Sequence, residues 1–531
     1  MKKNIIYGFV LLVFFCDSIY SQLVPGQVFG IYGGSQAEHG GLIVAAPDGG
    51  FLLLGETESF GNGRFDYVDT IAIRVDSEGK IVWQKTFGGW GSDYLTNVIK
   101  TADNHYIILI ISFSFEKLIT GWVIKIDDSG NVIWQEALNF GFSSALYALT
   151  EEMADGTFVV GGRWYDNYLH CYPSLLKLDT NGNVLWQKKF YKDDSIDAIV
   201  GLDDGGIFAG SSSALYRFDK DGNLIWCRKI FDFDGTAQNF MEDVKKADSG
   251  GFIVATNRLR PETSDIYSHP EVLRFSDDGK LLWAKRLVNH PLYCHQIMKK
   301  GNGEWLMAYG KTFFSFNEDG TMGKAATSYL IPFGPGVGTF LSKNKVATFA
   351  EDGNIAFVGW AQNVGNYIGK SDEIILIKTG MNNQISGGCS WMENFELEWE
   401  DVEIPVENIS FEVQDFEVDC VDTTPYGFVN PSYATGLNTF CPVIYSVEKM
   451  QDPFKLKISG DNLFIGPHTW YAEVTIDGVP VPTTTVKDVY TIIAKKGKSL
   501  KEMLPKGIPV CIKVTDEEEP HFQSDCFYFT R

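Results

Sequence analysis

The sequence contains 531 residues, carries a formal net charge of −23, and includes 54 glycines and 9 cysteines. A single hydrophobic core stops growing near ~250–300 residues, so we expect several modules or a repeat array. The negative charge argues against nucleic acid and anionic lipid as partners, and a composition with 44% hydrophobic residues excludes a disordered chain.

The first 21 residues have the pattern of a secretory signal peptide. Lysines at positions 2 and 3 precede an apolar run over positions 5–15, and small polar residues follow up to Ser21. The apolar run is too short for a ~30 Å bilayer, and no later run of similar character is long enough, so we expect no transmembrane segment. Cys16 would suit a lipoprotein, but the two bulky phenylalanines before it argue against lipidation. We expect an exported protein, periplasmic, cell-surface or extracellular, that begins at Gln22.

The mature chain is slightly more acidic than the full one and keeps eight cysteines. Residues 1–21 contribute +2 from two lysines and −1 from one aspartate, so their removal changes −23 to −24. An even number of cysteines in an exported chain permits disulfides, and the absence of CxxC argues against a zinc site. Cys511 with Cys526 is the first candidate pair and Cys420 with Cys441 the second. The sequence does not decide between disulfides and buried thiols for the other four cysteines: Cys171, Cys227, Cys294 and Cys389.

An internal repeat sets the expected architecture. Each copy has an apolar run, a turn containing Asp or Ser and Gly, and a Trp four residues after the glycine. Both flanks alternate apolar and polar residues, which predicts a β-hairpin. The five copies are Ile73–Lys85, Ile124–Glu136, Leu176–Lys188, Tyr216–Arg228 and Leu273–Lys285, and Phe314–Lys324 is a degenerate sixth without Trp.

A second turn signal alternates with the first and gives each unit four strands. Units of ~40–50 residues with four strands are typical of β-propeller blades. The last unit lacks a Trp-bearing strand, whereas Val28–Gly34 aligns with the outer strand of the first unit. We therefore predict that the N-terminal strand completes the last sheet and removes two open sheet edges. The seven centres of this signal are Gly49, Asn104, Gly156, Gly205, Gly250, Gly303 and Gly353.

The repeat resembles the PQQ-like and related bacterial propeller repeats, in which a D-x-x-G-x-x-x-W hairpin recurs once per blade. The resemblance covers about Gln27–Gly388 and implies an all-β, seven-bladed propeller over residues 22–388. It does not imply the PQQ cofactor, because the chain has no adjacent pair of cysteines. We expect no cofactor and no metal.

Two features of the repeat admit a functional alternative. The Asp-rich turns look like calcium loops, but Asp and Asn also suit tight turns because they bond their own backbone. The repeated tryptophans, Trp83, Trp134, Trp186, Trp226 and Trp283, would suit a sugar-binding stack, but their fixed position in every copy favours packing between sheets. We prefer the structural interpretation of both.

The last third of the chain contains two parts. Residues 389–439 contain no Lys or Arg and form an acidic segment, which we interpret as extended linker strands lying on the propeller. A calcium-binding surface is the alternative, but no D-x-D-x-D-G loop supports it. Residues 440–531 contain short strand-like runs, which predict an Ig-like β-sandwich. Ile458–Phe464 and Val474–Gly478 resemble IPT/TIG-type domains, which implies partner binding or a spacer role and no catalytic residue.

Four long loops on one predicted face carry the candidate binding residues. They connect the second and third strands of their units: Ser59–Asp69, Arg163–Pro173, Asn257–Pro270 and Gln362–Asp372. Function concentrates on loops of rigid scaffolds, and aromatic residues with Arg anchor interfaces, although ordinary loop variation would also explain them. The candidates are Arg64, Phe65, Tyr67, Trp164, Tyr165, Tyr168, His170, Arg258, Arg260, Tyr267, His269 and Tyr367.

The sequence favours a binding protein over an enzyme. It contains no HExxH, GxSxG or Walker A motif, and its eight histidines show no ligand spacing. We expect a monomer that binds an extracellular protein or glycan through the loops, as an adhesion or scaffold protein. The alternative is a carbohydrate-active hydrolase or lyase that uses His and carboxylates at the mouth of the propeller channel.

Overall fold

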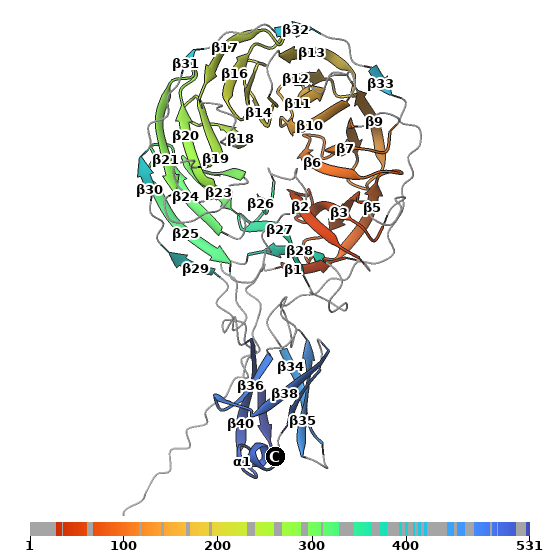
Figure 1. The fold of residues 1–531 in the computed structure, drawn as a ribbon, viewed down its shortest axis with the longest axis vertical. Coiled ribbons are helices and arrows are strands. Elements are labelled where there is room, and N and C mark those ends of the chain that lie inside the picture. Colours follow the sequence, from red (N-terminus) through yellow and green to blue (C-terminus); the bar gives the residue numbers. More distant parts are fainter. Residues whose placement is uncertain are drawn as a thin grey trace, which may run out of the picture.

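The computed structural model is almost entirely β-structure. It describes residues 28–33, 36–60, 67–115, 119–139, 143–165, 170–190, 194–230, 239–259, 268–287, 296–309, 312–328, 345–362, 372–379, 392–395, 399–401, 407–408, 413–415, 419–421, 443–450, 454–461, 472–488, 491–495, 497–516 and 527–531. Strands β1–β28 form seven antiparallel sheets around a central space (Figure 1).

Each of these sheets has four strands from this part of the chain. The first contains β2 (Glu38–Ala45), β3 (Phe51–Thr57), β4 (Asp69–Val75) and β5 (Ile81–Phe87). The second contains β6 (Asp93–Lys100), β7 (Tyr106–Ser112), β8 (Thr120–Ile126) and β9 (Val132–Asn139). The third contains β10 (Ser143–Leu149), β11 (Phe158–Tyr165), β12 (Cys171–Leu178) and β13 (Val184–Phe190).

The remaining sheets follow the same order. The fourth contains β14 (Ala198–Gly201), β15 (Ile207–Gly210), β16 (Ala214–Phe218) and β17 (Leu224–Lys229). The fifth contains β18 (Asn239–Lys246), β19 (Phe252–Leu259), β20 (Ser268–Phe275) and β21 (Leu281–Leu287). The sixth contains β22 (Gln296–Gly301), β23 (Glu304–Tyr309), β24 (Thr312–Asn317) and β25 (Met322–Ser328). The seventh contains β26 (Ala347–Phe349), β27 (Ile355–Gln362), β28 (Asp372–Lys378) and β1 (Val28–Tyr32).

The repeated tryptophans join each of the first five sheets to the next. The indole N–H of Trp134 donates to the Thr180 carbonyl at 2.9 Å, and its ring lies against Gly182 of the following sheet. Trp83 makes the equivalent bond to the Asp128 carbonyl at 2.7 Å. The turn glycines have positive φ and leave no room for a Cβ beside the ring. The predicted packing role of the tryptophans is therefore confirmed.

The N-terminal strand pairs as the repeat predicts. β1 runs antiparallel to β28, with Tyr32 opposite Ile374. The fully buried Tyr32 donates its hydroxyl to the Gly79 carbonyl of the first sheet at 2.6 Å. Tyr32 therefore does between the seventh and first sheets what the tryptophans do between the first six sheets.

The Asp-rich turns are held by their own side chains. Asp127 Oδ1 accepts hydrogen bonds from the backbone N–H groups of Ser129 and Asn131 at 2.9 and 2.8 Å. The Asn131 amide donates to Oδ2 at 2.9 Å. These bonds occupy the carboxylate as turn chemistry requires.

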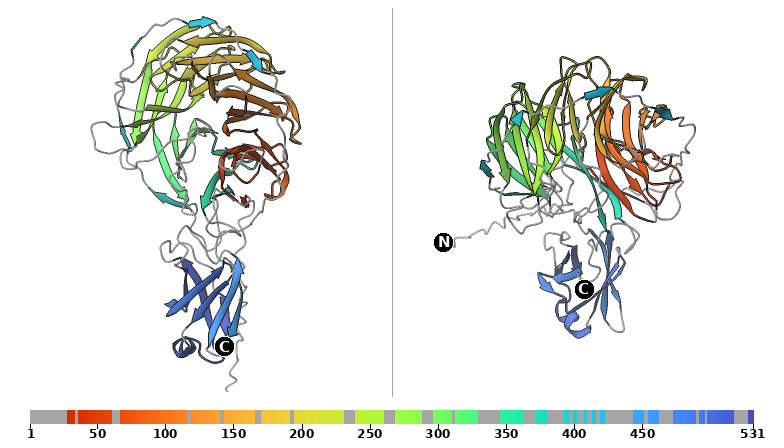
Figure 2. Two further views of the ribbon diagram at one scale, coloured as in Figure 1. Left: turned by 45° about the vertical axis from the view of Figure 1, so that its right-hand side comes forward. Right: turned by 45° about the horizontal axis from the view of Figure 1, so that its top comes forward.

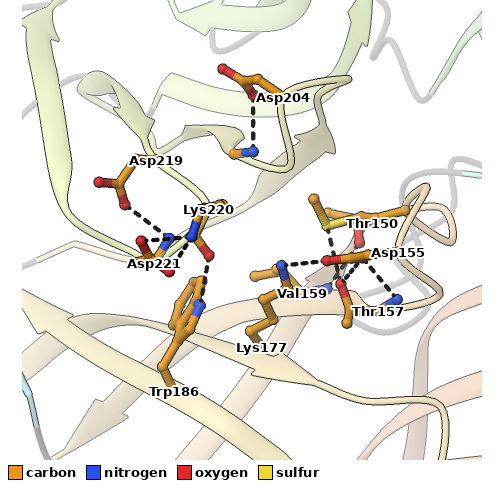
Figure 3. Close-up of polar contacts among 12 residues, drawn as sticks. Thr150, Asp155, Thr157, Val159, Lys177, Trp186, Asp204, Asp219, Lys220 and Asp221 are labelled. Carbon is orange, nitrogen blue, oxygen red and sulfur yellow. Dashed lines mark hydrogen bonds and ion pairs between the residues drawn. The ribbon is translucent and has the colours of Figure 1, made fainter.

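Ion pairs within the sheets were not expected from the sequence. Lys177, on the third strand of its sheet, reaches back to Asp155 in the turn between the first two strands, with Nζ and Oδ2 3.1 Å apart (Figure 3). Lys125–Asp103 at 3.1 Å and Lys378–Asp352 at 2.5 Å repeat this arrangement. Figure 3 also shows the neighbouring Trp186 indole directed at the Lys220 carbonyl, at 3.1 Å.

The acidic segment returns around the outside of the ring. Its five short strands add one edge strand each to the sixth, fifth, fourth, third and second sheets, in that order (Figure 1). We call these strands the belt. They are β29 (Met392–Phe395), β30 (Trp399–Asp401), β31 (Glu407–Asn408), β32 (Val413–Asp415) and β33 (Asp419–Val421).

Charge is complementary between the belt and the edges that it pairs with. In the antiparallel register, Glu400 and Asp401 lie opposite Arg286 and Lys285 of β21. Asp415 lies opposite Lys188 of β13 in the same way.

The C-terminal part is a two-sheet unit beside the ring (Figure 2). One sheet contains β34 (Val443–Met450), β35 (Lys455–Asp461), β39 (Thr491–Lys495) and β38 (Thr483–Asp488). The other contains β37 (Val479–Pro480), β36 (Ala472–Ile476), β40 (Pro509–Asp516) and β41 (Phe527–Thr530). Leu456, Val474 and Ile512 belong to their common core. One short helix, α1 (Gly497–Glu502), was not expected and buries Leu500 there.

The cysteines divide into bonded and unbonded groups. Cys511 in β40 is disulfide-bonded, whereas Cys171 and Cys227 are thiols. Cys420 lies in the belt strand β33. The predicted pairings stay predictions, because Cys441 and Cys526 lie outside the described residues, as do Cys294 and Cys389. Within the described ranges, no helix is long and apolar enough to cross a bilayer.

We predict that Trp134→Ala lowers the free energy of unfolding by about 2–3 kcal/mol, because it removes a half-buried aromatic ring and leaves a cavity between two sheets. Urea unfolding followed by circular dichroism measures this change. The adjacent Ile133 is 47% exposed, so Ile133→Ala is the matched control and should change stability by no more than about 0.5 kcal/mol. Equal effects of the two substitutions would contradict the packing role.

Candidate functional site

One side of the ring carries the connections between second and third strands together with the connections between sheets. We call it the loop face. The two kinds of connection touch there, since the Asp93 N–H donates to the Val68 carbonyl at 2.7 Å. The opposite side carries the tight turns and is called the turn face.

Six of the predicted candidates lie outside the described residues: Arg64, Phe65, Tyr168, Arg260, Tyr267 and Tyr367. Tyr67 lies on the loop face and is 44% exposed. His170 is exposed just before β12. Arg258 in β19 lies opposite His269 in β20 in the register of the fifth sheet.

The predicted loops are shorter than expected at their ends. β11 continues to Tyr165 and β12 begins at Cys171, so Trp164 and Tyr165 belong to a strand and not to a loop. β19 and β20 likewise include Asn257–Leu259 and Ser268–Pro270, and Asp69, Gln362 and Asp372 also lie in strands. The reason is that the ladder continues, as in the Trp164–Tyr172 pair, where aromatic residues stabilise the sheet.

The aromatic candidates of the third sheet contact neighbouring side chains of the same sheet. Trp164 stacks on Tyr172 with ring centroids 4.7 Å apart, and Lys189 Nζ lies 5.1 Å from the Trp164 ring. Arg163 lies 5.3 Å from the Tyr147 ring and 5.2 Å from the Tyr165 ring. Such cation–π contacts stabilise the strands on which these residues lie, so this cluster has a structural explanation.

Two exposed aromatic residues were missed by the sequence reasoning. Trp90 is 73% exposed in the connection between the first and second sheets, and Phe113 is 43% exposed after β7. Both lie on the loop face near Tyr67. The signal for Trp90 was its place among Gly88, Gly89 and Gly91, outside the repeated Trp position.

A buried carboxylate lies beneath these residues. Asp93 accepts hydrogen bonds from the Gly89 N–H at 2.9 Å and from the Ser112 and Ser114 hydroxyls. Burial raises the pKa of Asp93 to about 6, although these hydrogen bonds favour its charged form. Glu38 has the same position in the first sheet and accepts from Thr57 and Ser59. Because the arrangement recurs, we assign Asp93 to holding the loops.

Charged residues from three sheets meet at the central space. Lys345, just before β26, pairs with Glu151, just after β10, at 2.8 Å. Lys245 of β18 pairs with Asp243 at 2.8 Å. The surrounding protein raises the pKa of Glu151, whose side chain is nonetheless 65% exposed, but Lys345 and Lys245 outweigh this effect and leave the pKa below its ordinary value. Burial dominates at Asp243, whose pKa is raised.

The described residues give no support for a metal site. Groups of three or more His, Cys, Asp or Glu side chains that could hold an ion are absent from them. His39 lies edge-on to Trp360 at 5.2 Å, and His105 Nδ1 lies 2.9 Å from Asp103. Both contacts are local and suit structural histidines.

Comparisons with known proteins give distant likenesses only. No protein-family model matches the chain, and no curated protein matches it. A Bacteroides caccae protein of unknown function is similar over 52% of this chain and 90% of its own, with 14% identity and a TM-score of 0.33. The Neurospora crassa Pan2 WD40 domain covers 64% and 88%, with 12% identity and a TM-score of 0.38. The plexin A4 extracellular region covers 93% and 76%, with 10% identity and a TM-score of 0.39.

We predict that Asp93 titrates near pH 6 in the folded protein, which carboxyl carbon NMR measures. Its raised pKa means that the folded state holds the proton more tightly than the unfolded state, so the wild type loses stability as pH rises from about 4 to 6. In Asp93→Asn this loss is absent. Between pH 4 and 7, the unfolding free energy of Asp93→Asn should therefore gain up to about 3 kcal/mol relative to the wild type.

Asp127→Asn is the matched control for this titration. Burial raises the pKa of Asp127, but the hydrogen bonds from Asn131 and the turn backbone together outweigh it and leave this pKa below its ordinary value. Between pH 4 and 7, the unfolding free energy of Asp127→Asn should not increase relative to that of the wild type. An Asp93 midpoint near pH 4 would contradict the buried-carboxyl assignment.

Proposed function

We propose that this chain is an exported, seven-bladed β-propeller followed by an Ig-like sandwich, with residues 1–21 as its signal peptide. The seven sheets and the pairing of β1 with β28 support the propeller. The PQQ-like resemblance of the repeat and the IPT/TIG-like resemblance of residues 440–531 agree with these assignments. The domain boundaries remain those of the sequence: 22–388, 389–439 and 440–531.

The proposed function is non-catalytic binding of an extracellular glycan or protein through the loop face. The observation that carries it is the exposure of three large aromatic side chains on this face. Trp90 is 73% exposed, and Tyr67 and Phe113 are 44% and 43% exposed, although the edge of the Phe113 ring contacts Tyr94. Large exposed aromatic residues grouped on one face mark interaction sites. The protein would act as an adhesion or scaffold component, with the sandwich as a spacer or second binding unit.

Shortening the loops tests this function. The connections 61–66, 166–169, 260–267 and 363–371 are each replaced by a short Gly-Ser linker in the mature chain. Glycan arrays and pull-downs of extracellular proteins should show binding by the wild type and a loss of at least tenfold in the variant. An unchanged melting temperature confirms that the ring is intact. If this variant and Trp90→Ala both keep all of the binding, the loop face is not the binding surface.

A second candidate function is hydrolysis or elimination at the central space. Two carboxylates favour it, Glu151 and Asp243, because Lys245 acts on both and their pKa values are shifted in opposite directions. Two carboxyl groups with pKa values shifted apart suit acid–base catalysis. Their ion pairs already neutralise them, so we prefer binding.

We predict that the mature chain releases neither reducing ends nor unsaturated products from polysaccharides, and that Glu151→Gln leaves glycan or protein binding unchanged. Reducing-sugar assays and absorbance at 235 nm measure these products. Product release by the wild type that Glu151→Gln abolishes would replace binding with catalysis as the function. Asp155→Asn, on the turn face, is the matched control carboxylate.

A further inference from the structure

Three exposed rings occupy one place on the loop face. Tyr67, Trp90 and Phe113 come from three segments that hydrogen-bond to one another at their bases. The Phe113 N–H donates to the Ser92 carbonyl at 2.9 Å, and the Asp93 N–H donates to the Val68 carbonyl at 2.7 Å. We call these three residues the aromatic patch. It spans the junction of the first and second sheets.

The backbone beneath the aromatic patch is tightly fixed. The Gly91 N–H donates to the Ser114 hydroxyl at 3.0 Å, and the Gly89 N–H donates to Asp93 at 2.9 Å. A Cβ on Gly91 would lie 2.5 Å from the Phe113 carbonyl oxygen, and one on Gly88 would lie 2.1 Å from Asp69 Oδ1. The loop therefore accepts only glycine at these positions. A rigid loop that exposes Trp90 to solvent binds with little loss of conformational entropy.

The composition of the aromatic patch distinguishes its ligand. The described residues that flank it, 67–68, 88–92 and 112–115, include no charged side chain, and the adjacent carboxyl groups of Asp69 and Asp93 are buried. The exposed aliphatic residues of the ring lie elsewhere, at the turn ends of the outer strands: Val82, Ile133, Leu185, Ile225 and Leu282. Protein interfaces combine aromatic residues with Arg, Met and other apolar side chains. A surface of aromatic rings alone fits a flat, uncharged ligand better.

The hydrogen-bonding groups of the aromatic patch agree with such a ligand. The negative face of an aromatic ring attracts the weakly positive C–H face of a sugar ring. The Tyr67 hydroxyl and the Trp90 indole N–H are donors of the kind that sugar hydroxyls accept from. Among the described residues around the aromatic patch an anionic polysaccharide would find no cation, and it would meet a chain of strongly negative charge.

We infer that the aromatic patch of Tyr67, Trp90 and Phe113 is a binding subsite for a neutral polysaccharide, with sugar rings stacked on Trp90. This inference rests on the proposed loop-face function and specifies its ligand. It assigns the principal contact to a residue outside the four predicted loops. The Ig-like unit and the third-sheet aromatic residues take no part in it.

Affinity electrophoresis of the mature chain tests the inference. The probes are the neutral polysaccharides laminarin, mannan and xylan, with polygalacturonate as the anionic comparison. We expect retardation by at least one neutral polysaccharide and by no anionic one. Trp90→Ala should weaken that binding at least tenfold, Phe113→Ala and Tyr67→Ala should weaken it severalfold, and Trp90→Tyr should retain part of it. Quenching of tryptophan fluorescence by oligosaccharides should be smaller in Trp90→Ala.

Leu282→Ala is the matched control, because Leu282 is 53% exposed on the turn side of the ring. It should bind as the wild type does, and all variants should keep the melting temperature of the wild type. If Trp90→Ala binds unchanged while the four-loop variant does not, the inference is wrong and the loop-face function stands. If the wild type binds a protein and none of the neutral polysaccharides, the inference is also wrong. If the four-loop variant and Trp90→Ala both bind unchanged, both proposals are wrong.

Discussion

The architecture depends on one repeated contact, in which an aromatic ring from the outer strand of one sheet lies on the turn glycine of the next. The contact needs three things at once: a large flat ring, a turn with positive φ, and a carbonyl that accepts the indole N–H. Trp134 with Gly182 and Thr180 shows all three. Each contact fixes the angle between two neighbouring sheets. A ring of sheets can close only if these angles add up, so the last contact is under the strictest constraint.

Tyr32 meets that constraint with a different side chain. It brings the N-terminal strand into the last sheet and bonds to the Gly79 carbonyl of the first. The chain therefore closes the ring through residues more than 300 positions apart, because β1 begins at Val28 and β28 ends at Lys378. Such closure is costly in chain entropy, and the belt compensates by tying five successive outer edges together from outside. The starts of β29–β33 are six to eight residues apart, which as extended chain reaches about 20–28 Å.

Repetition explains how much of this could be predicted. In a repeat, each copy supports the interpretation of the others. The hairpins, the role of the tryptophans and the pairing of β1 could therefore be predicted from the sequence. The belt followed only in part: the acidic segment predicts extended strands lying on the propeller, but these strands have two to four residues and no repeat. Its alternating acidic residues indicated extended structure but not which edges it pairs with. The buried pairs such as Lys177–Asp155 were hidden for another reason, since the aspartates also satisfied the turn pattern.

Candidate binding residues are harder to predict, because a binding side chain must be left exposed by the packing of the fold, and the sequence alone does not show that packing. Trp164 looked suitable in the sequence, yet Tyr172 and Lys189 occupy its ring. Trp90 lies among glycines and outside the repeated Trp position, and its exposure is evident only when the surrounding strands are in place. The same glycines explain the difference: they let the loop pack closely on Asp69 and Phe113 and leave the ring between them in solvent. A side chain that is 73% exposed gains little from folding, which is why the proposed ligand site is centred on Trp90.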